Sequence, residues 1–201
     1  MQKYVAFISG LPVGRNAIAT DDLRSAMTRL GFLNVEVFST SGNVAFDTAP
    51  VGLVGPLEAQ ISRHIKRTFG VDDIWTFIRT AAELRDIITD LPYDSADVNE
   101  EGNSIFVVLL SEEPDSLTAR RLRIKRNDVD ELRLSRREIY WLRRRTEGEP
   151  VPPQPISEIL DAPATVRSLH SLQQIVAQLD KPKPKPRVKI DDSTQSERSR
   201  Q

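Results

Sequence analysis

Two glycines, an arginine and an asparagine follow the first apolar segment of the chain, within the stretch Gly10 to Asn16. A loop between a strand and a helix can hold an anion, because free backbone N–H groups and the positive end of the helix dipole converge there. An arginine guanidinium adds a charged donor to such a loop. The pattern therefore predicts a binding module for a phosphate-containing small molecule. The residues predicted to bind this ligand are Gly10, Gly14, Arg15, Asn16, Ser41 and Asn43.

The same residues have a structural interpretation. Gly10 and Gly14 would supply the positive φ angles of a strand-to-helix turn, with Arg15 in solvent, and residues 41–43 would form a tight hairpin turn. The first loop contains neither the Gly-Lys-Ser/Thr ending of a P-loop nor the Gly-x-Gly-x-x-Gly of a dinucleotide-binding fold. A glycine loop with an arginine after the first strand also resembles acylphosphatases, so a hydrolase of that type is an alternative hypothesis.

Arginine is concentrated in the second half of the chain. Residues 119–145 hold 11 basic and four acidic groups, whereas residues 1–118 hold nine basic and 17 acidic groups. With Tyr140 and Trp141 interleaved, this basic stretch would follow a nucleic-acid backbone. Strand alternation places the two aromatic residues on opposite faces, so we expect at least one of them in the core. The residues predicted for nucleic-acid binding are Arg136, Arg137, Arg143 and Arg144.

The composition excludes several kinds of chemistry. The 201 residues include no cysteine and only two histidines, so thiolate metal sites and cysteine nucleophiles are excluded, and a histidine-based metal site or triad is not expected. We predict no metal and no cofactor, and the sequence identifies no set of catalytic residues, so whether the protein is an enzyme stays open. A signal-peptide pattern is missing, and no stretch reaches the roughly 18 apolar residues of a membrane span, so we expect no membrane partner and a cytoplasmic location. The sequence makes no prediction of the oligomeric state.

Hydrophobic periodicity predicts the elements that would position the first group of residues. Gly31 and Gly70 follow two amphipathic patterns as helix stops, and Ser41-Gly42-Asn43 separates two alternating segments as a hairpin turn. The expected elements are a strand at 3–9, a helix at 20–30, strands at 35–40 and 44–47, a helix at 56–69 and a strand at 73–78. This β-α-β-β-α-β order is the split βαβ, or ferredoxin-like, pattern.

The remaining elements repeat that order. Thr80 and Glu83 form a capping-box signature for a linking helix, and the polar stretch 94–102 is predicted to be a loop. The second set comprises strands at 104–110, 129–134 and 138–142, helices at 115–123 and 156–160, a weak strand near Thr165 and a final helix capped by Ser168. We predict an α+β fold of two tandem ferredoxin-like halves with antiparallel sheets. The predicted boundaries are 1–80, a linking helix and loop at 81–103, 104–180, and a disordered Lys/Pro-rich tail at 181–201.

Several short motifs resemble a bacterial family. They are, in order, SGLPVGRN from Ser9, DLR from Asp22, LGF from Leu30, SGNVAF from Ser41, EIYW from Glu138 and APATVR from Ala162. The set is similar to the domain of unknown function DUF1697 over about residues 3–180. The resemblance implies two tandem ferredoxin-like halves and no assigned activity.

The chain departs from the family pattern within the first loop. Ser9 and Pro12 stand where the family has arginine and asparagine, and Gly14-Arg15 replaces a doubled glycine. The resemblance thus implies that part of any ligand site built from those residues is lost. Pro12 also removes one backbone N–H donor from the loop.

Overall fold

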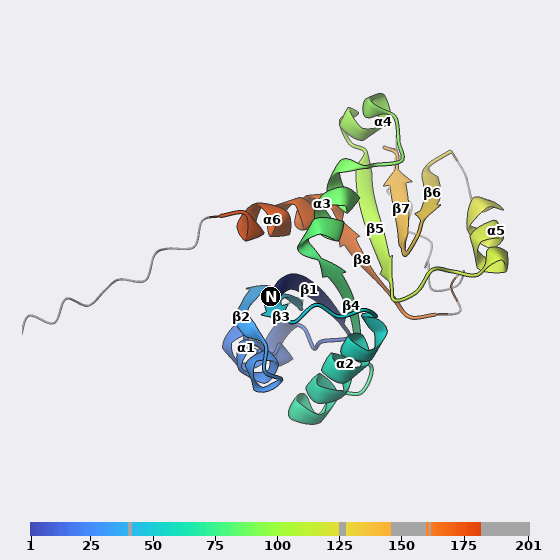
Figure 1. Cartoon of the computed structure of the whole chain (residues 1–201). Coiled ribbons are helices and arrows are strands. Elements are labelled where there is room, and N and C mark those ends of the chain that lie inside the picture. Colours follow the sequence, from blue (N-terminus) through green and yellow to red (C-terminus); the bar gives the residue numbers. More distant parts are fainter. Residues whose placement is uncertain (40–41, 125–127, 146–159, 161, 182–201) are drawn as a thin grey trace, which may run out of the picture.

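The computed structural model describes residues 1–39, 42–124, 128–145, 160 and 162–181. Its first half contains one four-stranded antiparallel sheet in the order β2-β3-β1-β4, with α1 and α2 on its outer face (Figure 1). These elements are β1 (Gln2–Ser9), α1 (Thr20–Arg29), β2 (Leu33–Ser39), β3 (Asn43–Thr48), α2 (Gly55–Phe69) and β4 (Trp75–Thr80). The predicted β-α-β-β-α-β order is confirmed.

The second half repeats the sheet with the order β6-β7-β5-β8, again fully antiparallel. Its elements are β5 (Ser104–Leu110), α5 (Ser116–Ile124), β6 (Asp130–Ser135), β7 (Glu138–Arg143) and β8 (Ala164–Ser168). The predicted helix at 156–160 lies outside the described residues except for Leu160, and the tail beyond residue 181 lies outside them entirely. The α+β fold with two tandem ferredoxin-like halves is confirmed.

One further helix follows the last strand of each half, and the two pack against each other between the sheets (Figure 1). These helices are α3 (Ala81–Thr89) and α6 (Leu169–Leu179). Both begin at a side-chain cap, because the Thr80 hydroxyl accepts from Glu83 N–H and the Ser168 hydroxyl accepts from Ser171 N–H. The capping box predicted from Thr80 and Glu83 is confirmed.

The polar stretch 94–102 is not entirely a loop. It contains the short helix α4 (Ser95–Asn99), in which the Asn99 side chain donates to Ser95 O. Val98 packs against the central hydrophobic core. The prediction failed because this contact with a distant part of the chain stabilises a helical turn that the local polar composition does not favour.

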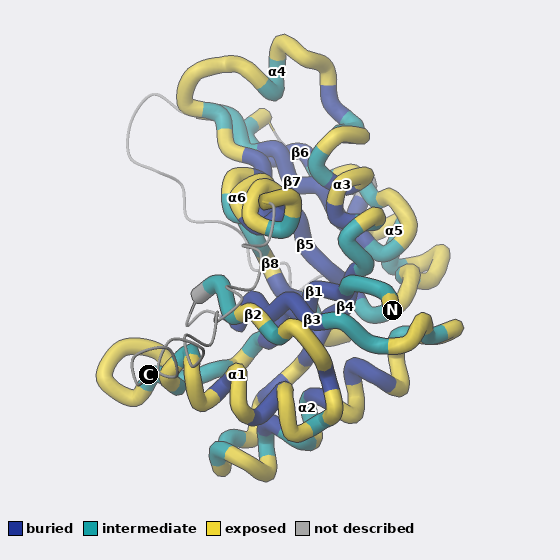
Figure 2. Tube along the Cα trace, turned by 60° about the vertical axis from the view of Figure 1, so that its left-hand side comes forward, coloured by how far each residue is buried: buried dark blue, intermediate teal, exposed yellow. Residues whose placement is uncertain are grey.

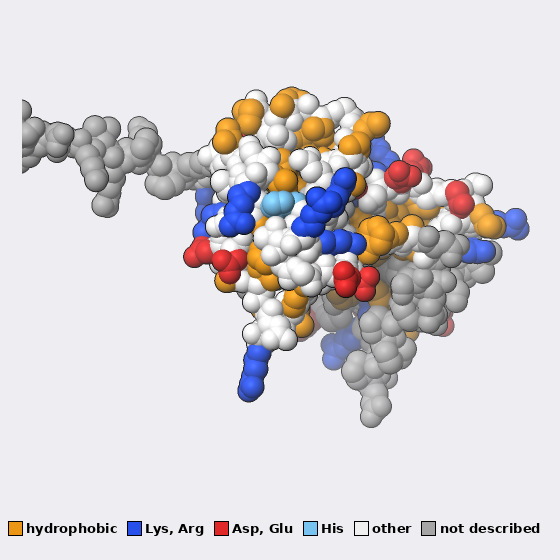
Figure 3. All heavy atoms as spheres, turned by 90° about the horizontal axis from the view of Figure 1, so that it is seen from below, with side chains coloured by type: hydrophobic (Ala, Val, Ile, Leu, Met, Phe, Trp, Pro, Cys, Tyr) orange, Lys and Arg blue, Asp and Glu red, His pale blue; other side chains and the backbone are white. Residues whose placement is uncertain are grey.

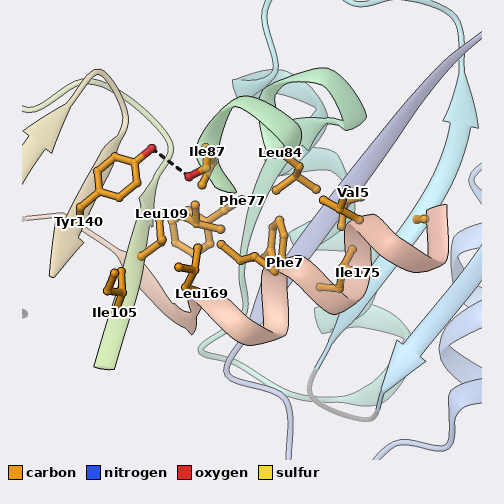
Figure 4. Close-up of a cluster of buried hydrophobic side chains, with 14 of the residues drawn as sticks. Val5, Phe7, Phe77, Leu84, Ile87, Ile105, Leu109, Tyr140, Leu169 and Ile175 are labelled. Atoms are coloured by element: carbon orange, nitrogen blue, oxygen red, sulfur yellow. Dashed lines mark hydrogen bonds between the residues drawn. The ribbon is translucent and has the colours of Figure 1, made fainter. Parts of the chain in front are cut away.

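The central core joins the two halves. Alternation along β1 sends Val5 and Phe7 toward the second half, while Tyr4, Ala6 and Ile8 face α1 and α2. Figure 2 shows that burial follows the central strands of both sheets, whereas the outer helices are largely exposed. Figure 4 shows the inward side chains meeting: Val5, Phe7 and Phe77 from one sheet, Ile105, Leu109 and Tyr140 from the other, Leu84 and Ile87 from α3, and Leu169 and Ile175 from α6.

A buried ion pair also joins the halves. Arg79 on β4 is fully buried, and its Nε donates to Glu138 Oε1 on β7 at 2.6 Å. The other guanidinium nitrogens donate to the carbonyl oxygens of Ile78, Leu110 and Arg137 at 2.8–3.1 Å. Burial lowers the pKa of Arg79, and the charge of Glu138 opposes that change. Every guanidinium nitrogen therefore has a partner, and two of the partner carbonyls come from the second half.

Two more carboxyls lie beside this pair, and their pKa values shift in opposite directions. Burial raises the pKa of Glu58, although its carboxylate accepts from Ile78 N–H at 2.7 Å. Burial also disfavours ionisation of Glu83, but hydrogen bonds with Thr80 and the charge of Arg137 outweigh it, so the pKa of Glu83 is lowered. The polar seam between the halves is thus organised around Arg79 and Arg137.

Candidate functional site

The two predicted glycine turns lie at the same end of the first sheet. Gly10 has φ +84°, and a Cβ there would lie 1.9 Å from Asp73 O. Gly42 also has φ +84°, and a Cβ there would lie 2.5 Å from Ile8 O. Because Ile8 N–H donates to Gly42 O at 2.8 Å, the hairpin is held against the end of β1. At both positions the backbone conformation and the close neighbouring atom require glycine. This agrees with the interpretation that these glycines shape turns.

The second part of the first loop is a single exposed 3-10 turn, Gly14–Asn16. Gly14 has φ +68° with open space around it, and Arg15 makes no ion pair with a residue that the structure describes. The loop does not run directly into α1, whose first turn carries Asp21 and Asp22. These carboxylates complement the positive end of the α1 dipole and repel an anion there. Among the predicted loop residues, Arg15 is therefore the remaining charged donor.

Asn43 is brought to a residue that the sequence-based site did not include. Its Oδ1 accepts from Arg167 Nε at 2.9 Å, although 124 residues separate the two in the chain. Arg167 also donates to Thr165 Oγ1 at 2.7 Å and lies 5.7 Å from the centre of the Phe7 ring. Burial lowers the pKa of Arg167. The SGNVAF and APATVR motifs thus meet in space, while Ser41 lies outside the described residues.

Three of the four arginines predicted to bind nucleic acid are engaged with carboxylates. Arg137 pairs with Glu83 at 3.0 Å. Arg144 pairs with Asp97 at 3.2 Å and with Glu131 at 2.8 Å. Arg143 lies 4.0 Å from Asp130. These carboxylates offset the charge of three of the four arginines that the sequence singled out.

Arg136, in the β6–β7 turn, is the exception. It is exposed and forms no ion pair with any described residue. The two aromatic residues of this stretch offer no stacking surface, because Tyr140 is 4% exposed in the central core and Trp141 is 6% exposed in the outer core beneath α5. The expectation that at least one of them lies in the core is confirmed for both.

A different basic group lies on the first half. Arg63, Lys66 and Arg67 occupy one turn of α2 and are called here the α2 basic turn. None of the three makes an ion pair with a described residue. Figure 3 views the face formed by α1 and α2, where Lys and Arg side chains gather around a histidine. Sequence reasoning passed over this group because three cations at helical spacing usually form a solvated face.

An exposed tryptophan stands beside the α2 basic turn. Trp75, at the start of β4, is 49% exposed, and Lys66 Nζ lies 5.5 Å from the centre of its ring. Ser9 pairs with Trp75 across the sheet, so the ring lies near the end of β1 where the first loop begins. Trp75 also lines a cavity of about 480 Å³ between the two halves, whose apolar lining includes Leu110 and Leu160.

The geometry and the motifs can be compared with known proteins. A family profile described as "Protein of unknown function (DUF1697)" matches residues 1–140. The chain belongs to the DUF1697 family. The resemblance read from the motifs is thereby confirmed over residues 1–140, a range that does not include the APATVR motif, and the family description names no ligand or activity.

A solved structure supports the same architecture for this DUF1697 protein. It is described as "conserved bacterial protein SP0830 from Streptococcus pneumoniae", with a TM-score of 0.62 and 17% sequence identity. The match covers 89% of this chain and 98% of that one, and at this identity it supports the fold alone. A comparison with curated proteins gives no significant match.

The described part of this DUF1697 chain holds no cluster of three or more histidine, aspartate or glutamate side chains able to hold a metal ion. Among the described helices, none is long and apolar enough to cross a membrane. Two features discussed below can contribute to ligand recognition: the cationic side chains of the first half and the cavity that Trp75 lines.

Proposed function

We propose that the protein is a binding module for a phosphate-containing ligand and that cations of the first half recognise the phosphate. One observation carries the proposal. Arg15 and the α2 basic turn make no ion pair with a described residue, whereas three of the four arginines singled out in the second half do. A cation without a carboxylate partner meets a phosphate without first breaking an ion pair.

The alternatives have less support. Binding nucleic acid through Arg137 and Arg144 would require these side chains to leave carboxylates at 2.8–3.2 Å. An acylphosphatase-like hydrolase would need an asparagine that orients a water molecule, and the amide oxygen of Asn43 is instead engaged with Arg167. Recognition of phosphate requires only donors that are already exposed.

Titration of ¹⁵N-labelled protein with inorganic phosphate and with ATP tests the proposal. We expect saturable chemical-shift changes at the backbone amides of residues 14–17 and 63–67. These residues either bear the side-chain cations without a described carboxylate partner or are their neighbours in the chain. Arg15→Ala should weaken phosphate binding in the loop by about 1.5–3 kcal/mol, the scale of a hydrogen bond to a charged group.

Sodium chloride at matched ionic strength is the solvent control, and Arg136→Ala is the matched control for removal of an exposed arginine. Equal shifts in chloride and phosphate would contradict the proposal. So would a larger loss of binding in Arg136→Ala than in Arg15→Ala.

A further inference from the structure

We infer that the phosphate-containing ligand is a nucleotide whose base stacks on Trp75 in the 480 Å³ cavity and whose phosphate lies against the α2 basic turn. This inference rests on the proposed function and names its ligand class. A free nucleotide and one unit of a single strand share this chemistry.

The cavity has the size and wall of a small-molecule site. Its volume of about 480 Å³ lies within the range that accommodates drug-sized ligands. Trp75 comes from the first half, and Leu110, Leu160 and Pro163 come from the second. An indole ring half exposed to solvent at the wall of this cavity offers a face on which a nucleobase stacks.

The phosphate has a partner beside the same ring. Lys66 Nζ lies 5.5 Å from the centre of the Trp75 ring, and Arg63 and Arg67 share its turn of α2. Ligand binding here would place the base in the cavity and the phosphate among cations that have no described carboxylate partner. The aromatic ring thus suits the base of a nucleotide, and the adjacent cations suit its phosphate.

The cavity also favours one kind of base. Glu112 and Glu113 line it, are exposed and make no ion pair with a described residue. Asp115 lines it too, but its carboxylate caps α5 by accepting from Thr118 N–H at 2.7 Å. Carboxylates accept hydrogen bonds from exocyclic amino groups and repel carbonyl oxygens. We therefore expect preference for adenine or cytosine over hypoxanthine or uracil.

Intrinsic fluorescence provides the test, because the chain has two tryptophans and the other, Trp141, is only 6% exposed. AMP should quench the emission of Trp75 saturably. IMP, which has a carbonyl in place of the amino group, should bind at least about tenfold more weakly. Trp75→Leu should weaken AMP binding about 5- to 150-fold, measured by calorimetry, which is the scale of one stacked base.

Leu33→Ala is the control variant, since Leu33 is another large apolar side chain exposed to solvent, at 54%. Thermal melting followed by circular dichroism confirms that each variant is folded. An oligoadenylate that binds more tightly than AMP would support the inference and assign the nucleotide to a single strand. Weaker binding of the oligoadenylate would support it and assign a free nucleotide.

Two results would overturn the inference. The first is that Trp75→Leu binds AMP as tightly as the wild type, which would show that the base does not stack on Trp75. The second result is that phosphate shifts the amides of residues 63–67 but AMP does not quench Trp75. This result would reject a nucleotide as the ligand and leave the proposed phosphate-binding function intact. If neither phosphate nor AMP binds, the proposed function fails as well.

Discussion

Replacing Arg79 with alanine is expected to destabilise the protein by about 3–5 kcal/mol, measured by chemical denaturation at neutral pH. The variant leaves the Glu138 carboxylate buried without its partner at 2.6 Å. It also removes the donors to Leu110 O and Arg137 O, which hold the second half against β4. A buried charge or carbonyl that loses its partner costs far more than a contact between exposed groups.

Arg85→Ala is the matched control for this prediction. Arg85 pairs with Asp180 at 2.6 Å, but both side chains are about half exposed. An exposed pair contributes about 0–1 kcal/mol, so the control should melt close to the wild type. Similar losses in the two variants would show that the Arg79 pair does not join the halves.

Gly10→Ala should destabilise the protein by about 2–5 kcal/mol, the sum of a left-handed backbone and an overpacked contact. Gly10 has φ +84°, and an added Cβ would lie 1.9 Å from the backbone oxygen of Asp73. That atom cannot turn aside as a flexible side chain does. Either β1 or the segment before β4 must shift, and both carry core residues.

Gly14→Ala separates the two causes. Gly14 has φ +68° but open space around its Cα, so only the backbone cost of about 1–2 kcal/mol applies. Denaturation of both variants under the same conditions should give the larger loss for Gly10→Ala. Equal losses would mean that the approach of Asp73 does not constrain the loop.

The order of helices and strands could be predicted from local sequence patterns, and the structure contains the elements that these patterns indicate. Three local signals are each visible in a single segment: the continuous apolar run of β1, the spacing of Leu57, Ile61 and Ile65 in α2, and the helix stop at Gly70, which has φ +66°. The capping side chains of Thr80 and Ser168 each accept a hydrogen bond from a backbone N–H only three residues further along the chain. Element order was predictable because each element has its own periodicity and ends.

The candidate site was less predictable because its contacts are long-range. The need for glycine at position 10 comes from the backbone of Asp73, and the partner of Asn43 is Arg167. Long-range contacts also explain why the sequence overestimated the free positive charge of the second half. Nothing near Arg144 in the sequence indicates that Asp97 pairs with it, so counting arginines overstated the free positive charge.

The most direct test of recognition by first-half cations is a calorimetric titration with inorganic polyphosphate, a base-free ligand. We compare the double variant Arg63→Ala/Arg67→Ala with Arg120→Ala/Arg136→Ala, which removes two exposed arginines of the second half. The first variant should bind about tenfold or more weakly than the wild type, because two charged donors are lost, and the second should bind like the wild type. The opposite order, or equal loss in both variants, would contradict the assignment of phosphate recognition to the first half.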